Sequence, residues 1–392
     1  MKNSIPIDLI IEKVSRSTAK SVARCHCVSK QWRAIFRRKY FIELFLTRSK
    51  ARPRILFVVQ DGEWSEWSFL SLPQPQYSSL VVESADFHMK KFSAGISGYN
   101  YFTYASGLIY FKCMRIPKED EDEKQVLCNP LTGQYVILPE LRVYGIFSYL
   151  GFDPVDKEFK VLFMTTPDYI ASKDVDHYIL TLRTGELKWR TIQCPFTHEP
   201  LWTRICINGV LYYSAVNSDG NYVIVCFDVR YEKFKLVDTK CRSEFNGLIN
   251  YKGKLCGVKL KYAYRVGFPV KLRMRVLEDV EKDEWSTYVY TLCDDDDDDV
   301  SEVVKVKVKQ NLSVAGMTAT GDIVLFMKFA SNPFYVFYFN PERNSLQVQS
   351  VEIQGLGANP DRIACNAFVD YVEDLSVNDA MLQLNSIPLQ QD

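Results

Sequence analysis

The chain has 392 residues, of which 47% are hydrophobic, 14% aromatic and 24% charged, a composition typical of folded globular proteins and too apolar for a disordered chain. Its apolar runs are far shorter than the 18 or more residues that span a bilayer, so we expect no membrane partner. The net charge is zero, but residues 1–54 contain 14 Lys and Arg against three Asp and Glu, and the remainder contains 34 against 45. This imbalance of +11 and −11 predicts two modules with different partners.

The cysteines and the N-terminal segment indicate the cellular compartment. Eleven cysteines are an odd number, and their spacing does not resemble the dense disulfide framework of a small secreted domain. Asp8, Glu12 and Lys13 interrupt the apolar stretch that a secretory signal would need. We therefore expect reduced thiols and a location in the cytoplasm, the nucleus or both.

Apolar residues at helical spacing predict three short helices between residues 5 and 46. Pro6 suits the first position of a helix, because its missing N–H would have no partner there. Ser17 and Thr18 are N-cap residue types that are expected to begin the second helix, and Ser29 is a possible cap of the third. A module of about 42 residues is close to the lower limit for an independent core, so we expect some of its apolar surface to face a partner.

Two patterns in this segment occur together: Ile5-Pro6-x-Asp8-Leu9-x-x-Glu12 and Val28-Ser29-Lys30-x-Trp32. Together they resemble the F-box motif of plant F-box proteins. The resemblance implies docking onto a Skp-family adaptor and, through it, onto the cullin and RING protein of an SCF (Skp–cullin–F-box) ubiquitin ligase. The residues it implies for the adaptor surface are Ile5, Pro6, Leu9, Ile10 and Val14, with Val28 and Trp32 adding to this surface or supporting it from below.

The segment departs from the family pattern at two places. Lys13 stands where an aliphatic residue is usual, and Ser17-Thr18 stands where Leu-Pro is usual. Lys13 can lay its methylene groups along the adaptor and keep its ammonium in water; if it does not, the missing apolar contact costs about 1.5–3 kcal/mol. A stand-alone protein-binding module with weakened adaptor contact is therefore the alternative function.

Beyond residue 54 the chain consists of short apolar runs broken by Gly, Pro, Asn and Asp, which predicts strands joined by turns. One unit recurs, a strand, a turn and a second strand, and a turn glycine leads into another strand before most copies. A period near 50 with about four strands is typical of propeller blades of the kelch size class. The turn positions Asn129, Leu182, Asp228, Asp279 and Asn340 mark the unit, and Gly107, Gly209, Gly253 and Gly321 mark the preceding turn.

These patterns predict a mainly β protein in which a small α-helical N-terminal module precedes a β-propeller-like domain of six blades. The expected domains are residues 1–50, residues 51–375 and a C-terminal tail of residues 376–392. Residues 127–133, 150–162 and 206–212 also resemble the F-box-associated domain of plant F-box proteins. That resemblance implies the capture of a substrate protein, whose identity it does not give.

Aromatic residues in the expected loops are candidates for the substrate surface, because aromatic anchors dominate protein interfaces. The alternative is that their rings pack between blades. The candidates are Trp64, Trp67, Phe196, Trp202 and Tyr264.

No catalytic or metal-binding motif stands out in the sequence. Cys25, His26 and Cys27 are adjacent, and adjacent residues of a helix point about 100° apart, so they do not share one metal. His177 and His198 have no HExxH-type neighbourhood, and neither a Gly-x-Ser-x-Gly elbow nor a phosphate loop occurs. We therefore expect a non-catalytic subunit with no metal and no cofactor, with a propeller enzyme carrying a helical appendage as a further alternative.

The basic residues of the helical segment also suggest nucleic acid as a partner. Arg33, Arg37, Arg38 and Lys39 are expected to cluster on the third helix. The same helix carries a broad apolar stripe, and the F-box pattern accounts for both features, so we expect no nucleic-acid partner.

Overall fold

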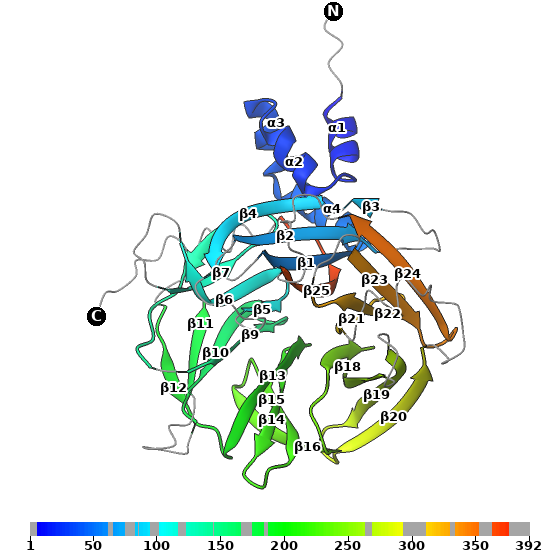
Figure 1. The fold of residues 1–392 in the computed structure, drawn as a ribbon. Helices are drawn as coiled ribbons and strands as arrows, with labels where there is room; N and C mark the ends of the chain where they lie inside the picture. The colour runs from blue at the N-terminus through cyan, green and yellow to red at the C-terminus, as the bar shows by residue number, and fades with distance from the viewer. Residues whose placement is uncertain are drawn as a thin grey trace, which may run out of the picture.

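The computed structural model describes residues 6–61, 66–74, 83–84, 86–94, 102–116, 123–143, 145–165, 175–183, 187–262, 269–292, 311–329, 334–352 and 363–375. A group of helices stands on one side of a ring of β-sheets (Figure 1). The prediction of a mainly β protein with a small helical N-terminal module is therefore confirmed. Across the described residues, none of the helices is long and apolar enough to cross a membrane.

The helical module contains four helices: α1 (Ile7–Val14), α2 (Ala19–His26), α3 (Lys30–Phe36) and α4 (Lys39–Lys50). Of the expected N-cap residues, Thr18 caps α2 and Ser29 caps α3, whereas Ser17 precedes the cap. The Thr18 hydroxyl accepts a hydrogen bond from the main chain of Ser21 at 3.4 Å, and the Ser29 hydroxyl accepts one from that of Trp32 at 3.1 Å. Each cap provides a partner for an N–H group that has none within its helix.

The fourth helix differs from the expected three, because the third helix ends at Phe36. Arg38 is extended, with a ψ of 138°, and a new helix follows it. In one continuous helix, Phe36 and Phe41 would point about 140° apart, since successive residues turn by about 100°. The break lets both rings enter the same core, where their centroids lie 4.7 Å apart and both side chains are buried.

The ring consists of six blades of four antiparallel strands, as predicted. From the axis outward, blade 1 contains β25 (Ile363–Tyr371), β1 (Arg54–Asp61), β2 (Glu66–Pro73) and β4 (Asp86–Ala94), and blade 2 contains β5 (Phe102–Ala105), β6 (Leu108–Arg115), β7 (Lys124–Cys128) and β8 (Tyr135–Ile137). In the same order, blade 3 contains β9 (Phe147–Asp153), β10 (Glu158–Met164), β11 (His177–Leu182) and β12 (Arg190–Ile192), and blade 4 contains β13 (His198–Ile207), β14 (Val210–Asn217), β15 (Tyr222–Asp228) and β16 (Lys233–Cys241). Blade 5 contains β17 (Gly247–Tyr251), β18 (Lys254–Tyr262), β19 (Pro269–Asp279) and β20 (Glu284–Thr291), and blade 6 contains β21 (Leu312–Met317), β22 (Ile323–Met327), β23 (Phe334–Asn340) and β24 (Ser345–Glu352).

Blade 1 closes the ring with strands from both ends of the propeller sequence. β25 pairs with β1 in antiparallel register, with Leu56 opposite Phe368 and Val59 opposite Cys365. A two-residue strand, β3 (Glu83–Ser84), lies parallel to β24 at the edge of blade 6. The closure supplies partners for strands that would otherwise be open edges.

The recurring turn of the sequence joins the third and fourth strands of a blade. Its first residue is Asn or Asp, whose side-chain oxygen accepts a hydrogen bond from the main chain two residues later, and the residue four positions later has a positive φ. The first residues are Asn129, Asp228, Asp279 and Asn340, and the residues with positive φ are Gly133 (70°), Glu232 (56°), Asp283 (52°) and Asn344 (47°). The short asparagine or aspartate side chain thus stabilises the same turn in four blades.

The turn glycines join the first and second strands. In blade 4, Asn208 and Gly209 both have positive φ, at 49° and 85°, which is the geometry of a two-residue type I′ hairpin. Lys252 and Gly253 adopt the same geometry in blade 5, at 50° and 87°. The glycine is favoured there because it adopts positive φ without strain.

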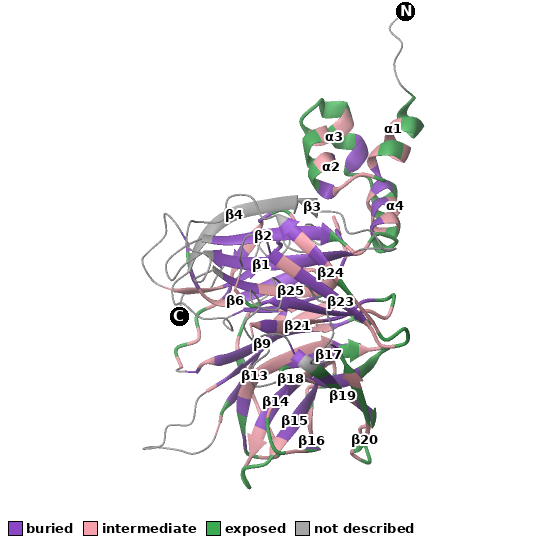
Figure 2. Ribbon diagram, turned by 45° about the vertical axis from the view of Figure 1, so that its right-hand side comes forward, coloured by how far each residue is buried: buried purple, intermediate pink, exposed green. Residues whose placement is uncertain are grey.

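The helical module contacts the propeller where β25 ends and β1 begins (Figure 2). The main chain of Ala19 donates a hydrogen bond to the carboxylate of Glu373 at 3.0 Å, and Leu131 and Leu375 pack against the core of the module. α4 continues to Lys50 and β1 begins at Arg54, so residues 51–53 are all that lies between the two. The expected domain boundaries at residues 50 and 375 stay predictions.

Candidate functional site

The helical module exposes large apolar side chains beside a small closed core. Leu9 is 55%, Val28 63% and Ile7 41% exposed, and we call these three residues the exposed apolar group. Exposed apolar side chains mark interaction sites where they gather into a patch, so these residues are candidates for a partner surface. These three residues are not part of the buried core of the module. That core consists of Ala19, Val22, Ile35, Phe36, Phe41 and Phe45.

The residues expected at the adaptor surface divide into two sets. Pro6, at the N-cap of α1, is exposed like Leu9 and Val28. Ile10, Val14 and Trp32 are half-buried and pack against the core of the module. Trp32 meets Phe36 edge to face, with ring centroids 5.8 Å apart, so its ring is part of the packing of the module. Ile5 lies outside the described residues.

Polar contacts with α4 fix the position of α1, none of whose residues is fully buried. One guanidinium nitrogen of Arg48 donates to the main-chain oxygen of Glu12 at 2.7 Å, and another donates to its carboxylate. The hydrogen bond from Arg48, followed by the one from Arg16, lowers the pKa of Glu12. Glu12 therefore stays ionised at neutral pH and holds the helix that carries Leu9.

Lys13 follows Leu9 by four residues, which places both on the same side of α1. The Lys13 side chain is exposed, as are those of Arg33, Arg37, Arg38 and Lys39 around the end of α3. Of these, Arg33 donates to the main-chain oxygen of His26 at 3.3 Å, and Lys39 forms an ion pair with Glu43 at 3.8 Å. The helical module thus exposes positive charge both on α1 and around the end of α3.

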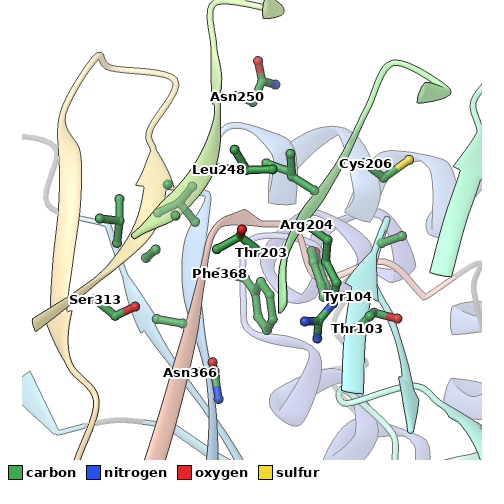
Figure 3. Close-up of a pocket in the computed structure, with 18 of the residues that line it drawn as sticks. Thr103, Tyr104, Thr203, Arg204, Cys206, Leu248, Asn250, Ser313, Asn366 and Phe368 are labelled. Atoms are coloured by element: carbon green, nitrogen blue, oxygen red, sulfur yellow. The ribbon is translucent and has the colours of Figure 1, made fainter. Parts of the chain in front are cut away.

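The propeller offers a second candidate site, a cavity of about 360 Å³ on its axis (Figure 3). The innermost strand of every blade contributes to it: β25, β5, β9, β13, β17 and β21. Its lining is mixed, with Thr203, Asn250 and Ser313 among the polar residues and Leu248 and Phe368 among the apolar ones. Arg204 donates to the main-chain oxygen of Trp202 at 2.6 Å, and its guanidinium lies 5.4 Å from the Tyr149 ring.

The aromatic candidates for substrate binding occupy different environments. Trp67 is 3% exposed, and its ring lies 5.3 Å from those of both Phe102 and Phe111, which is packing between strands of blades 1 and 2. Trp202 lines the axial cavity and packs against Phe147 at 4.7 Å. Phe196 is half-buried. Trp64 and Tyr264 lie outside the described residues.

The two most exposed large apolar side chains among the described residues of the propeller were not singled out in the sequence. Val155 is 68% and Tyr231 67% exposed. They lie in neighbouring turns of blades 3 and 4, which Arg230 joins through ion pairs with Asp153 at 3.0 Å and Asp156 at 2.8 Å. The main chain of each donates a hydrogen bond to the side chain of an Asp two or three residues earlier, Asp153 or Asp228, and such an Asp at a turn is the signal in the sequence.

The comparisons with known proteins agree with this architecture. The family described as the F-box associated beta propeller domain matches residues 54–372. A putative F-box protein of Arabidopsis thaliana is 91% identical over 392 residues and covers 100% of both chains. F-box only protein 12 of the same plant is 64% identical over 100% of this chain and 86% of its own. A solved TolB structure from Acinetobacter baumannii covers 81% of this chain and 66% of its own at 10% identity, and its TM-score of 0.42 is too low to support an argument.

The matching family is the F-box associated domain. The expected likeness to kelch blades therefore rests on the length of the repeat alone. The helical module, the six-bladed ring and the relatives together identify the family. The chain belongs to the F-box proteins that carry an F-box associated β-propeller domain.

Proposed function

We propose that this chain is the substrate-recognition subunit of an SCF-type E3 ubiquitin ligase. Its helical module binds a Skp-family adaptor, which connects it to the cullin and the RING protein, and its propeller holds a target protein. The chain performs no covalent chemistry itself. It acts by raising the effective concentration of the target beside the ubiquitin-charged enzyme.

The observation that carries the adaptor interaction is the exposed apolar group of Ile7, Leu9 and Val28. Burying a large apolar side chain contributes about 1.5–3 kcal/mol. Association itself costs about 4–15 kcal/mol in lost translational and rotational freedom, so a stable complex needs several such residues together. Three exposed apolar side chains on one small module, two of them within the family's motif, support this proposal.

Co-expression with a Skp-family adaptor tests the proposal, followed by size-exclusion chromatography of the full chain. We expect the two proteins to elute together, and we expect Val28→Ala to reduce the bound fraction. Val289→Ala is the matched control, because Val289 is 51% exposed but lies in β20 on the propeller. Separate elution of the unmodified chain and adaptor would contradict the proposal.

A stand-alone binding module is the second candidate, favoured by one observation. Lys13 is exposed and lies one helical turn after Leu9, where its charge faces the same side as the proposed adaptor. An ammonium that cannot reach water in the complex would oppose binding. A chain that binds no adaptor, either unmodified or as Lys13→Ile, is the outcome that this second function predicts.

Exposed side chains also indicate which surface of the propeller contacts the target protein. Val155 and Tyr231 are exposed on turns that Arg230 joins, and tyrosine is enriched among the residues that dominate interfaces. We expect a target to contact these turns. Crosslinking from a photoreactive group at position 231, compared with one at the exposed position 288 in β20, tests this placement.

A further inference from the structure

Three side chains with metal-binding atoms come together between blades 3 and 4. His177 begins β11, His198 begins β13, and Cys194 lies in the segment between β12 and β13. Among the residues that the structure describes, their nearest nitrogen and sulfur atoms all lie within 4.8 Å of one another. The cluster lies at the ends of strands opposite the turns that carry Val155 and Tyr231, because strands of a blade alternate in direction.

The environment of His177 leaves one of its ring nitrogens available for a ligand. The residue is 3% exposed, and its Nε2 has no hydrogen-bond partner among the described residues. A buried polar atom without a partner costs about 1–3 kcal/mol. The main-chain oxygen of Val175 accepts a hydrogen bond from the His177 ring, so the other ring nitrogen, Nε2, has the lone pair.

The neighbouring histidine is oriented in the same way. His198 is 2% exposed, its Nε2 lies 2.8 Å from the hydroxyl of the fully buried Tyr213, and its Nδ1 lies 3.9 Å from the sulfur of Cys194. In the tautomer whose Nε2–H donates to Tyr213, Nδ1 has a lone pair for a ligand, and a metal ion there would replace the present contact of Nδ1 with the main-chain oxygen of Phe196 at 3.5 Å. Metal-binding histidines are commonly held in this manner by a second partner on the ring.

The protonation states suit a cation. Burial lowers the pKa of His177 and of His198 to about 4, so both rings are neutral at pH 7, as a ligand must be. Burial raises the pKa of the Cys194 thiol, so a thiolate at this place needs a positive charge beside it. Cys194 is half-buried, unlike the two histidines, which gives the cluster access from solvent.

We propose that His177 Nε2, His198 Nδ1 and Cys194 Sγ bind one transition-metal ion, and that Zn²⁺ is the ion they suit best. Two imidazoles and a thiolate are a borderline-soft set that zinc binds tetrahedrally, with a fourth position left for water. Bonds of about 2.0–2.3 Å require the three atoms to close in by roughly 1 Å. The ion would link blade 3 to blade 4.

Cobalt(II) titration of the full, reduced and metal-free chain tests the site. We expect one equivalent to produce the visible bands of tetrahedral cobalt and a thiolate-to-cobalt charge-transfer band, both removed by added Zn²⁺. Cys194→Ser should abolish the charge-transfer band, whereas Cys27→Ser, at an exposed cysteine of the helical module, should leave it unchanged.

Two further measurements distinguish a loss of metal binding from a loss of folding. Tyr213→Phe keeps all three ligands and should weaken cobalt affinity about 10–100-fold while retaining the spectrum. Zn²⁺ should raise the unfolding temperature of the unmodified chain and not that of Cys194→Ser. The proposal is overturned if no stoichiometric cobalt spectrum forms, or if the spectrum survives Cys194→Ser or disappears with Cys27→Ser.

Discussion

The main-chain N–H of Ala19 donates to the carboxylate of Glu373 at 3.0 Å, although the two residues are 354 positions apart in the sequence. Ala19 is the first residue of α2, where main-chain N–H groups have no partner within the helix. A carboxylate at this end also meets the positive end of the helix dipole. The contact joins the helical module to the segment that follows the closing strand of the propeller.

Removing this carboxylate should loosen the helical module. Glu373 is 5% exposed, and hydrogen bonds to charged groups contribute about 1.5–3 kcal/mol, so Glu373→Ala should lower the free energy of unfolding by that order. Glu373→Gln keeps an acceptor oxygen and should lose less. Chemical denaturation measures the change, and limited proteolysis at residues 51–53 should accelerate in Glu373→Ala. Unchanged stability and proteolysis would contradict the assigned role of the contact.

The fold was largely predictable because its signals are local. Asp228 and its counterparts stabilise their turn through hydrogen bonds within four residues, and Gly209 is required by the φ of its own turn. The break between Phe36 and Phe41 was not predictable in this way, since it depends on which rings share a core. Tertiary packing decides such a boundary, and helical spacing alone does not.

Acid should weaken an ion pair between blades 3 and 4. Glu232 accepts hydrogen bonds from Lys160 at 2.7 Å and from Arg190; burial acts to raise its pKa, but these bonds outweigh burial and the pKa of Glu232 is lowered. The unfolded chain therefore binds the extra proton first as the pH falls below about 4.3. The stability from this pair is present above that pH and is lost as the pH falls through the lower, folded pKa.

Glu232→Gln should be less stable than the unmodified chain by about 3 kcal/mol at pH 7, because Lys160, 7% exposed, keeps a buried charge without its carboxylate. The difference should shrink as the pH falls from 5 to 3, as measured by urea denaturation. Glu342→Gln is the control: its partner Lys252 is exposed, and such pairs contribute about 0–1 kcal/mol. A difference that persists in acid would refute the ion-pair account.

A methyl group at position 257 should destabilise blade 5. A Cβ atom built on Gly257 would lie 2.5 Å from the ring of Phe245, which is 5% exposed and packs within the core between blades 4 and 5. Overpacking of this kind costs about 1–3 kcal/mol, so Gly257→Ala should unfold at lower denaturant concentration. Gly220→Asn should change little, because a Cβ there meets no atom within 4 Å and asparagine tolerates its positive φ. Restoration of stability by Phe245→Leu in the Gly257→Ala chain would identify the contact.

The candidate sites were only partly predictable from the sequence. The motif located Leu9 and Val28, whose exposure the structure reports, but Ile10 and Trp32 in the same motif face the core. His177 and His198 carry no recognisable spacing because they belong to strands of different blades. Their proximity to Cys194 depends on how the blades pack, which local patterns do not encode.

Adaptor binding should depend on the side of α1 that carries Leu9 and Lys13. Leu9→Ala removes an exposed apolar anchor and should weaken binding about tenfold or more, whereas Arg38→Ala, outside that helix, should change it little. Lys13→Ile replaces a charge with the aliphatic residue that is usual at this position and should tighten binding.

Calorimetric titration of the full chain with a Skp-family adaptor tests the central claim most directly. We predict a one-to-one complex whose affinity decreases in the order Lys13→Ile, unmodified chain, Leu9→Ala, with Arg38→Ala close to the unmodified chain. Circular dichroism of each variant verifies that the helices are intact. An affinity that does not respond to Leu9→Ala, or the absence of heat with every variant including Lys13→Ile, would contradict the claim that this module is an adaptor-binding F-box.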